Sequence, residues 1–272
     1  MSGARSVVGL STSSVYPEPT EQAFAYAAEL GYDAVEVMVG MDDTSQDLAA
    51  VQRLAYAHQL PICSVHAPCL LFTQRVWGTE PWGKLVRSAE MAAEVGADVV
   101  VVHPAFRWQR EYARDFVDGI AALEESTGIA FAVENMYPWR ASNRRVVRRE
   151  VEMYLPGFDP STEPYANTTL DVSHASTAGS DLLAMAAAMG DRLRHLHLTD
   201  GSGSPKDEHL VPGRGSMPVA GLLATLADRE FAGHVVLEIN TRRAPDREAR
   251  LADLAESLAF ARTHLRQDPA AG

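Results

Sequence analysis

Cysteine is scarce in this sequence: 272 residues contain only Cys63 and Cys69. The fold therefore does not rest on disulfide bonds, which fits a reducing compartment. Long hydrophobic runs are also absent, and no segment reaches the roughly 20 apolar residues that span a membrane. The first residues, Met1 to Ser6, lack the pattern of a secretory signal. These absences predict a cytoplasmic protein with no membrane partner.

Positive charge is scarce as well. Lysine and arginine number 24 against 36 aspartate and glutamate residues, which gives a formal net charge of −12. A protein with this balance repels polyanions as a whole, although local basic patches and bound metal ions are not captured by the count. The charge therefore argues against duplex DNA as a partner.

Strand-like and helix-like segments alternate along the whole chain. The length is typical of one barrel, and strands this apolar suit a parallel sheet that is buried on both faces. We expect a single (β/α)8 TIM barrel over residues 1–266, with long loops at 67–81, 135–167 and 199–217 and a disordered tail at 267–272. An open doubly wound sheet is the rival fold, but no glycine-rich phosphate loop follows the first strand.

Six short apolar runs each stop on a residue that can bind a metal. In a barrel, the carboxyl ends of parallel strands open onto one face, so these residues should converge there. Carboxylate and imidazole ligands in this mixture suit divalent cations, and crowded acidic groups without a cation would repel each other. The runs are Ile62–His66, Val99–His103, Ala130–Glu134, Thr168–Asp171, Leu193–His197 and Val235–Glu238.

Four segments carry a resemblance to a known superfamily. They are Val133-Glu134-Asn135, Leu170 to His174, His195 to Asp200, and Leu237-Glu238. Together they resemble the xylose-isomerase-like TIM barrels, which include sugar isomerases, epimerases and the endonuclease IV enzymes of AP endonuclease family 2. The resemblance covers nearly the whole barrel.

In endonuclease IV-like proteins the matching residues complete a three-metal site. The resemblance therefore implies more than one divalent ion, with Zn²⁺ or Mn²⁺ expected and Mg²⁺ or Co²⁺ as alternatives. The implied ligands are His66, His103, Glu134, Asp171, His174, His197, Asp207, His209 and Glu238.

The sequence also departs from the two branches of the superfamily. Cys69 stands where the DNA-repair enzymes usually carry an aromatic residue, and the first strand ends in Ser11-Thr12-Ser13 without their His-Val-Ser signature. These departures argue against DNA as substrate. The sugar epimerases often carry a further glutamate shortly after the fifth strand, where this chain reads Met136 to Arg140.

Several further residues are candidates for substrate contact. The insertion after Glu134 carries an arginine run from Arg140 to Arg149, which could clamp an anion or form a solvated face. We expect Arg214 to bind a substrate phosphate, with Arg140 and Trp139 as further contacts. Glu36 could contact substrate or belong to a buried network. His195 is predicted to fill the barrel interior, since it lies on the same strand face as His197.

These residues support two functional hypotheses. The favoured one is a multi-metal hydrolase that cleaves a phosphoester of a small carbohydrate-like molecule, with Glu134, Glu238 and His174 as catalytic residues. The alternative is a single-metal isomerase or epimerase of a sugar or sugar phosphate, in which Glu134 and Glu238 transfer the proton. The expected partner is thus a small phosphorylated or polyol substrate. A non-catalytic sugar-binding barrel is the third class considered.

Overall fold

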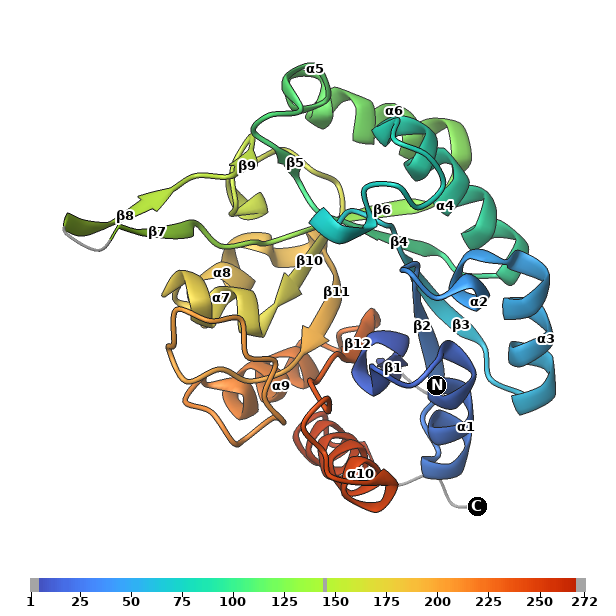
Figure 1. Ribbon diagram of the computed structural model, residues 1–272. Coiled ribbons are helices and arrows are strands. Elements are labelled where there is room, and N and C mark those ends of the chain that lie inside the picture. The colour runs from blue at the N-terminus through green and yellow to red at the C-terminus, as the bar shows by residue number, and fades with distance from the viewer. Residues whose placement is uncertain (1–4, 144–145, 268–272) are drawn as a thin grey trace.

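The computed structural model describes residues 5–143 and 146–267, without the side chains of residues 140–149. Eight parallel strands close into one barrel in the order β1-β12-β11-β10-β6-β4-β3-β2, so the predicted TIM barrel is confirmed (Figure 1). The barrel strands are β1 (Val7–Ser11), β2 (Ala34–Met38), β3 (Ile62–His66), β4 (Val99–Val102), β6 (Ala130–Glu134), β10 (Thr168–Asp171), β11 (Leu193–Leu198) and β12 (His234–Leu237).

Helices surround the barrel and bury its outer face. Phe24 of α1, Leu85 of α4 and Phe116 of α6 are fully buried between helices and strands. The helices are α1 (Thr20–Leu30), α2 (Asp43–Gln46), α3 (Leu48–His58), α4 (Pro81–Val95), α5 (Arg110–Arg114), α6 (Phe116–Thr127), α7 (Val172–Ala178), α8 (Leu182–Met189), α9 (Val219–Asp228) and α10 (Arg247–His264). In the part of the chain that the structure describes, none of them has the length and apolar content to cross a membrane.

Glycines in the left-handed conformation end several of these helices. Gly31, Gly96 and Gly128 follow α1, α4 and α6 with φ between 72° and 78°. A side chain disfavours this conformation, and glycine therefore ends the helix cheaply. Aspartates begin other helices: Asp47 and Asp181 each accept backbone N–H groups at the start of α3 and α8.

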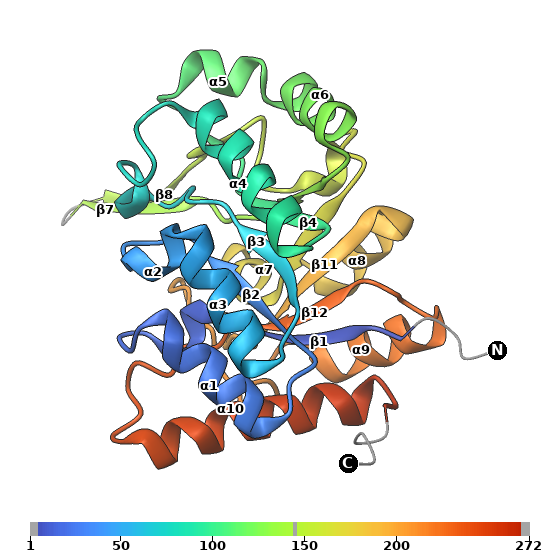
Figure 2. The same ribbon diagram turned by 90° about the vertical axis from the view of Figure 1, so that its right-hand side faces the viewer.

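The segment between β6 and β10 departs from the β/α rhythm. Its described residues hold no α-helix, only the antiparallel hairpin β7 (Trp139–Asn143) and β8 (Val146–Val151), β9 (Tyr154–Leu155) and η3 (Pro160–Thr162). β9 pairs with β5 (Ala105–Phe106) beside the barrel. The hairpin lies at one end of the barrel and the start of β1 at the other (Figure 2). The remaining short helices are η1 (Thr12–Val15), η2 (Leu71–Thr73) and η4 (Gly190–Arg192).

The predicted tail lies mostly outside the described residues, at 268–272. Its first residue, Gln267, is held in place: its backbone N–H donates to Arg262 O and its side chain donates to Ser6 O at 3.0 Å. Gln267 is therefore tied to the rest of the protein, and the remainder of the predicted tail lies outside the described residues.

Candidate metal centre

The structure brings all nine predicted ligands together at the carboxyl ends of the strands. Six of them lie at strand ends. His66, Glu134 and Asp171 are the last residues of β3, β6 and β10, His103 and Glu238 directly follow β4 and β12, and His197 is the next-to-last residue of β11. Eight of the nine, all except Asp207, fall into three groups that could hold a metal ion, each with its donor atoms within 4.8 Å of one another. The strand ends predicted this convergence for six of the nine, and the resemblance to the superfamily added His174, Asp207 and His209.

The first group consists of His66, His103 and Glu134. His66 Nε2 lies 3.3 Å and His103 Nε2 lies 3.0 Å from Glu134 Oε2. All three side chains are buried. His66 Nδ1 lies 3.0 Å from Ala67 O, so this nitrogen can donate its proton to the carbonyl and leave Nε2 free as a ligand.

The central group adds Asp171, His197 and Glu238 to Glu134. His197 Nδ1 lies 3.1 Å from Glu134 Oε1, 3.0 Å from Glu238 Oε2 and 3.6 Å from Asp171 Oδ2. Asp171 Oδ1 begins α7 by accepting the backbone N–H of His174 at 2.6 Å. The other oxygen, Oδ2, is buried and has no hydrogen-bond donor. A buried carboxylate oxygen without a donor fits a cation ligand.

The third group consists of Asp171, His174 and His209, and Asp207 links two of its members. Asp207 Oδ2 lies 3.3 Å from His174 Nε2 and 3.1 Å from His209 Nε2. His209 Nδ1 lies 2.8 Å from Glu238 O, which leaves Nε2 directed to the cluster. Because Glu134 and Asp171 each belong to two groups, the three groups form one connected set of ligands.

Two residues that the sequence analysis did not single out hold this part of the site. Ser173 Oγ donates to Asp207 Oδ1 at 2.7 Å and accepts the backbone N–H groups of Glu208 and His209. Asp200 accepts four backbone N–H groups of the same loop, including those of Gly213 and Gly215. His209 has φ of 47°, an unfavourable value for a side-chain-bearing residue that these contacts maintain.

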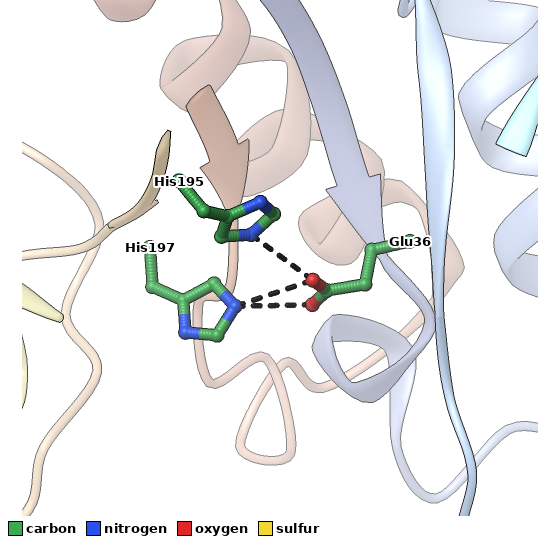
Figure 3. Close-up of side chains that lie close together, drawn as sticks. All are labelled: Glu36, His195 and His197. Atoms are coloured by element: carbon green, nitrogen blue, oxygen red, sulfur yellow. Dashed lines mark hydrogen bonds and ion pairs between the residues drawn. The ribbon is translucent and has the colours of Figure 1, made fainter. Parts of the chain in front are cut away.

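Glu36 lies on the barrel side of the central group, where Figure 3 shows it with two histidines of β11. Glu36 Oε1 lies 3.2 Å from His197 Nε2, and Glu36 Oε2 lies 3.0 Å from His195 Nε2. Both Glu36 and His195 are completely buried. Glu36 is therefore a member of a buried network and does not line the open cavity, and His195 fills the barrel interior as expected.

Burial and charge act in opposite directions on the pKa values of these groups. Burial alone would raise the pKa of Glu134, but the neighbouring His197 and His103 hold it well below its usual range. Burial raises the pKa of Glu238 and of Asp171. Burial alone would lower the pKa of His209, yet Asp207 raises it to about 10. Neighbouring carboxylates also hold the pKa of His197 and of His174 well above its usual range, whereas burial lowers the pKa of His103 to about 4.

A cavity of about 440 Å³ opens above the ligands, a size in the range of small-molecule sites. Glu134, His174, Asp207, His209 and Glu238 face it. Its remaining wall includes residues that the strand-end argument could not identify, because they lie in loops and short 3-10 helices beyond the strands: Ser13, Tyr16, Phe72, Tyr137, Asn240 and Arg242. Ser13 Oγ also donates to Glu238 Oε1 at 3.2 Å.

Two further predicted substrate contacts, Arg214 and Trp139, do not line the cavity in the part of the chain that the structure describes. Arg214 is half-exposed and pairs with α10, with Nη2 2.8 Å from Asp253 Oδ1 and Nε 3.0 Å from Glu256 Oε1. The Asp200 contacts fold the loop so that this arginine points outward. Trp139 is half-buried and packs near Phe106. The side chain of Arg140 lies outside the described residues.

Comparison with known proteins agrees with this architecture. The family described as xylose isomerase-like TIM barrel matches residues 24–264. The chain belongs to this family. An uncharacterized protein of Mycobacterium leprae (strain TN) is 52% identical over 272 residues, covering 95% of this chain and 97% of that protein.

Two more distant matches have informative names. Fructoselysine 3-epimerase of Escherichia coli O157:H7 is 24% identical over 244 residues, which cover 82% of this chain and 86% of that enzyme. The crystal structure of the IOLI protein with a binding zinc atom superposes with a TM-score of 0.70 at 13% identity, covering 95% of this chain and 99% of that one. At this identity the second match shows the shared fold. A fructoselysine 3-epimerase is thus among the relatives of this family member.

Proposed function

We propose that this protein is a divalent-metal-dependent isomerase or epimerase that acts on a small sugar or sugar derivative. The observation that carries the proposal is the central group, in which the carboxylates of Glu134 and Glu238 meet the same imidazole nitrogen of His197, at 3.1 and 3.0 Å. The likeness to fructoselysine 3-epimerase supports it. We therefore place the isomerase or epimerase hypothesis ahead of the hydrolase hypothesis that the sequence favoured.

The donor set suits the ion that this chemistry needs. The ion would be held by Glu134, Asp171, His197 and Glu238. When bound, a divalent cation would withdraw electron density from a substrate carbonyl and so acidify the neighbouring C–H bond. Three carboxylates with one imidazole suit Mn²⁺ or Zn²⁺ among common divalent ions.

The protein groups then transfer the proton. Glu238 and Glu134 come from different strands, β12 and β6, and both face the cavity. One carboxylate removes the proton from the carbon beside the carbonyl and the other returns a proton, which inverts the carbon or moves the carbonyl. Ser13 orients Glu238 through its hydrogen bond to Oε1. Tyr16, Phe72 and Tyr137 form aromatic parts of the cavity wall, against which a sugar ring can pack.

Multi-metal phosphoester hydrolysis is the second candidate. The observation that favours it is the linkage of the three ligand groups through Glu134 and Asp171, since shared carboxylates commonly bridge neighbouring ions. His66 and His103 in one group, and His174 and His209 in another, would hold the additional ions. Such a cluster can activate water and stabilise the leaving oxygen, with Glu134, Glu238 and His174 as catalytic residues.

Deuterium incorporation distinguishes the two candidates. We would incubate the metal-replete enzyme in D₂O with ketoses, aldoses, fructosyl amines and sugar phosphates, and follow the carbon-bound protons by NMR. The proposal predicts deuterium beside the carbonyl without phosphate release. Glu238→Gln should reduce the exchange by about 10²–10⁴-fold, the usual contribution of acid–base catalysis. The control Glu90→Gln, on the exposed face of α4, should leave it unchanged. Phosphate release without exchange would establish the hydrolase instead.

A further inference from the structure

The fully buried Glu36 and His195 contact His197 from the side opposite to the cavity. His197 directs Nδ1 to Glu134, Asp171 and Glu238, and directs Nε2 to Glu36 at 3.2 Å. We propose that Glu36, supported by His195, is a positioning residue that fixes the orientation and tautomer of His197 and thereby sets the metal affinity of the centre. The inference rests on the metal site of the proposed function.

An imidazole has one nitrogen for the metal and one for a proton. A histidine that coordinates through Nδ1 carries its proton on Nε2, and a carboxylate that accepts this N–H fixes the ring and makes the other nitrogen a better ligand. Glu36 Oε1 and Oε2, at 3.2 and 3.3 Å from Nε2, are placed to accept it. Such outer carboxylates commonly orient metal-bound imidazoles.

Glu36 is itself held from three sides. Ser64 Oγ, on the neighbouring strand β3, donates to Glu36 Oε2 at 2.8 Å, and His195 Nε2 lies 3.0 Å from the same oxygen. A buried carboxylate needs such partners to remain charged in the barrel interior. His195 in turn lies edge-on to the His197 ring, with centroids 4.9 Å apart. The pair therefore limits the rotation of His197.

The same three residues could be read as a separate cation site, because their donor atoms also lie within 4.8 Å of one another. That site would require His197 to bind ions through both nitrogens and to lose its last ring proton. In the proposed centre, Nδ1 of His197 is already a ligand of the ion that Glu134, Asp171 and Glu238 would hold. A proton shared between Nε2 and Glu36 is the simpler arrangement, and it uses Glu36 as an acceptor.

Metal affinity separates positioning from a purely structural role. We would measure the Zn²⁺ Kd of the full-length protein by competition with a chelating indicator, and the unfolding of each metal-free form separately. Glu36→Gln keeps the shape and removes the charge, and it should raise the Kd about 10–100-fold. The control Thr169→Val removes another buried barrel hydrogen bond, from Oγ1 to Ala132 O, and should leave the Kd close to wild type.

Each outcome has a distinct meaning. Glu36→Gln with a lower metal-free stability but a wild-type Kd would overturn the positioning role, whereas a wild-type protein that binds no Zn²⁺ would overturn the proposed function itself. If Glu36→Gln does not fold, the ring protonation of His197 in the wild-type protein still tests the proposal. In the Zn²⁺-loaded protein with ¹⁵N-labelled histidine, NMR should show His197 protonated at Nε2 and not at Nδ1, with the signal assigned through His197→Gln. The opposite tautomer would refute the inference.

Discussion

Removing the charge of Glu134 should destabilise the metal-free protein strongly. Four imidazole nitrogens, from His66, His103, His174 and His197, lie 3.0–3.3 Å from its two carboxylate oxygens, and the side chain is 1% exposed. In Glu134→Gln these imidazoles lose their shared anion while remaining buried. Removing one partner of a buried ion pair costs about 3–5 kcal/mol, and we expect the free energy of unfolding to fall by this amount.

The corresponding assay is thermal and urea unfolding in the presence of a chelator. For a chain of this size, 1 kcal/mol lowers the Tm by roughly 2–4 °C, so Glu134→Gln should melt roughly 6–20 °C below wild type. Glu90→Gln is the matched control, and a change at such an exposed site is usually within about 0.5 kcal/mol. A folded Glu134→Gln protein whose metal-free stability equals that of wild type would refute the reasoning, because the carboxylate would then not be holding the cluster together.

Three further predictions concern metal number, pH and nucleic acid. His209→Ala should lower turnover by about 10–100-fold or more if the third ligand group carries a working ion, and far less if only the central group does, as steady-state kinetics at saturating metal will show. Burial lowers the pKa of His234 to about 4. Between about pH 6.5, the ordinary pKa of histidine, and about pH 4, His234 is therefore protonated in the unfolded chain but not in the folded protein. The free energy of unfolding should fall by up to about 3 kcal/mol over this range, and by less in His234→Gln. The metal-replete enzyme should not incise an abasic-site duplex at low salt, given the net charge of −12; efficient incision would reassign it to the repair branch.

The sequence was sufficient to predict the barrel and those site residues that lie at strand ends. A strand that is buried on both faces is apolar, so a polar residue at its end is conspicuous, and parallel order brings such ends to one face. His66, Glu134, Asp171 and His197 were identifiable for this reason. Asp207 and His209 lie in a loop, and only the resemblance to the superfamily connected them to the site.

Sequence patterns did not predict the features that depend on a particular capping contact or on residues far apart in the chain. The short helix α7 was not predicted, because Val172–Ala178 is rich in residues of weak helix preference and its start depends on the Asp171 cap. Arg214 was expected at the substrate, but its partners Asp253 and Glu256 lie about forty residues away on α10. The role of Glu36 depends on a contact across the barrel interior that no spacing along the chain reveals.

The tight clustering of nine metal-binding side chains is the basis of the functional proposal, and metal content tests it most directly. Protein purified without chelator under metal-replete conditions should carry at least one Zn²⁺ or Mn²⁺ per chain by elemental analysis. A second ion, held by the connected ligand groups as in the sequence-based expectation, would favour the hydrolase candidate. Glu238→Gln should reduce the metal content in either case. Protein that retains no divalent ion under these conditions would contradict the account.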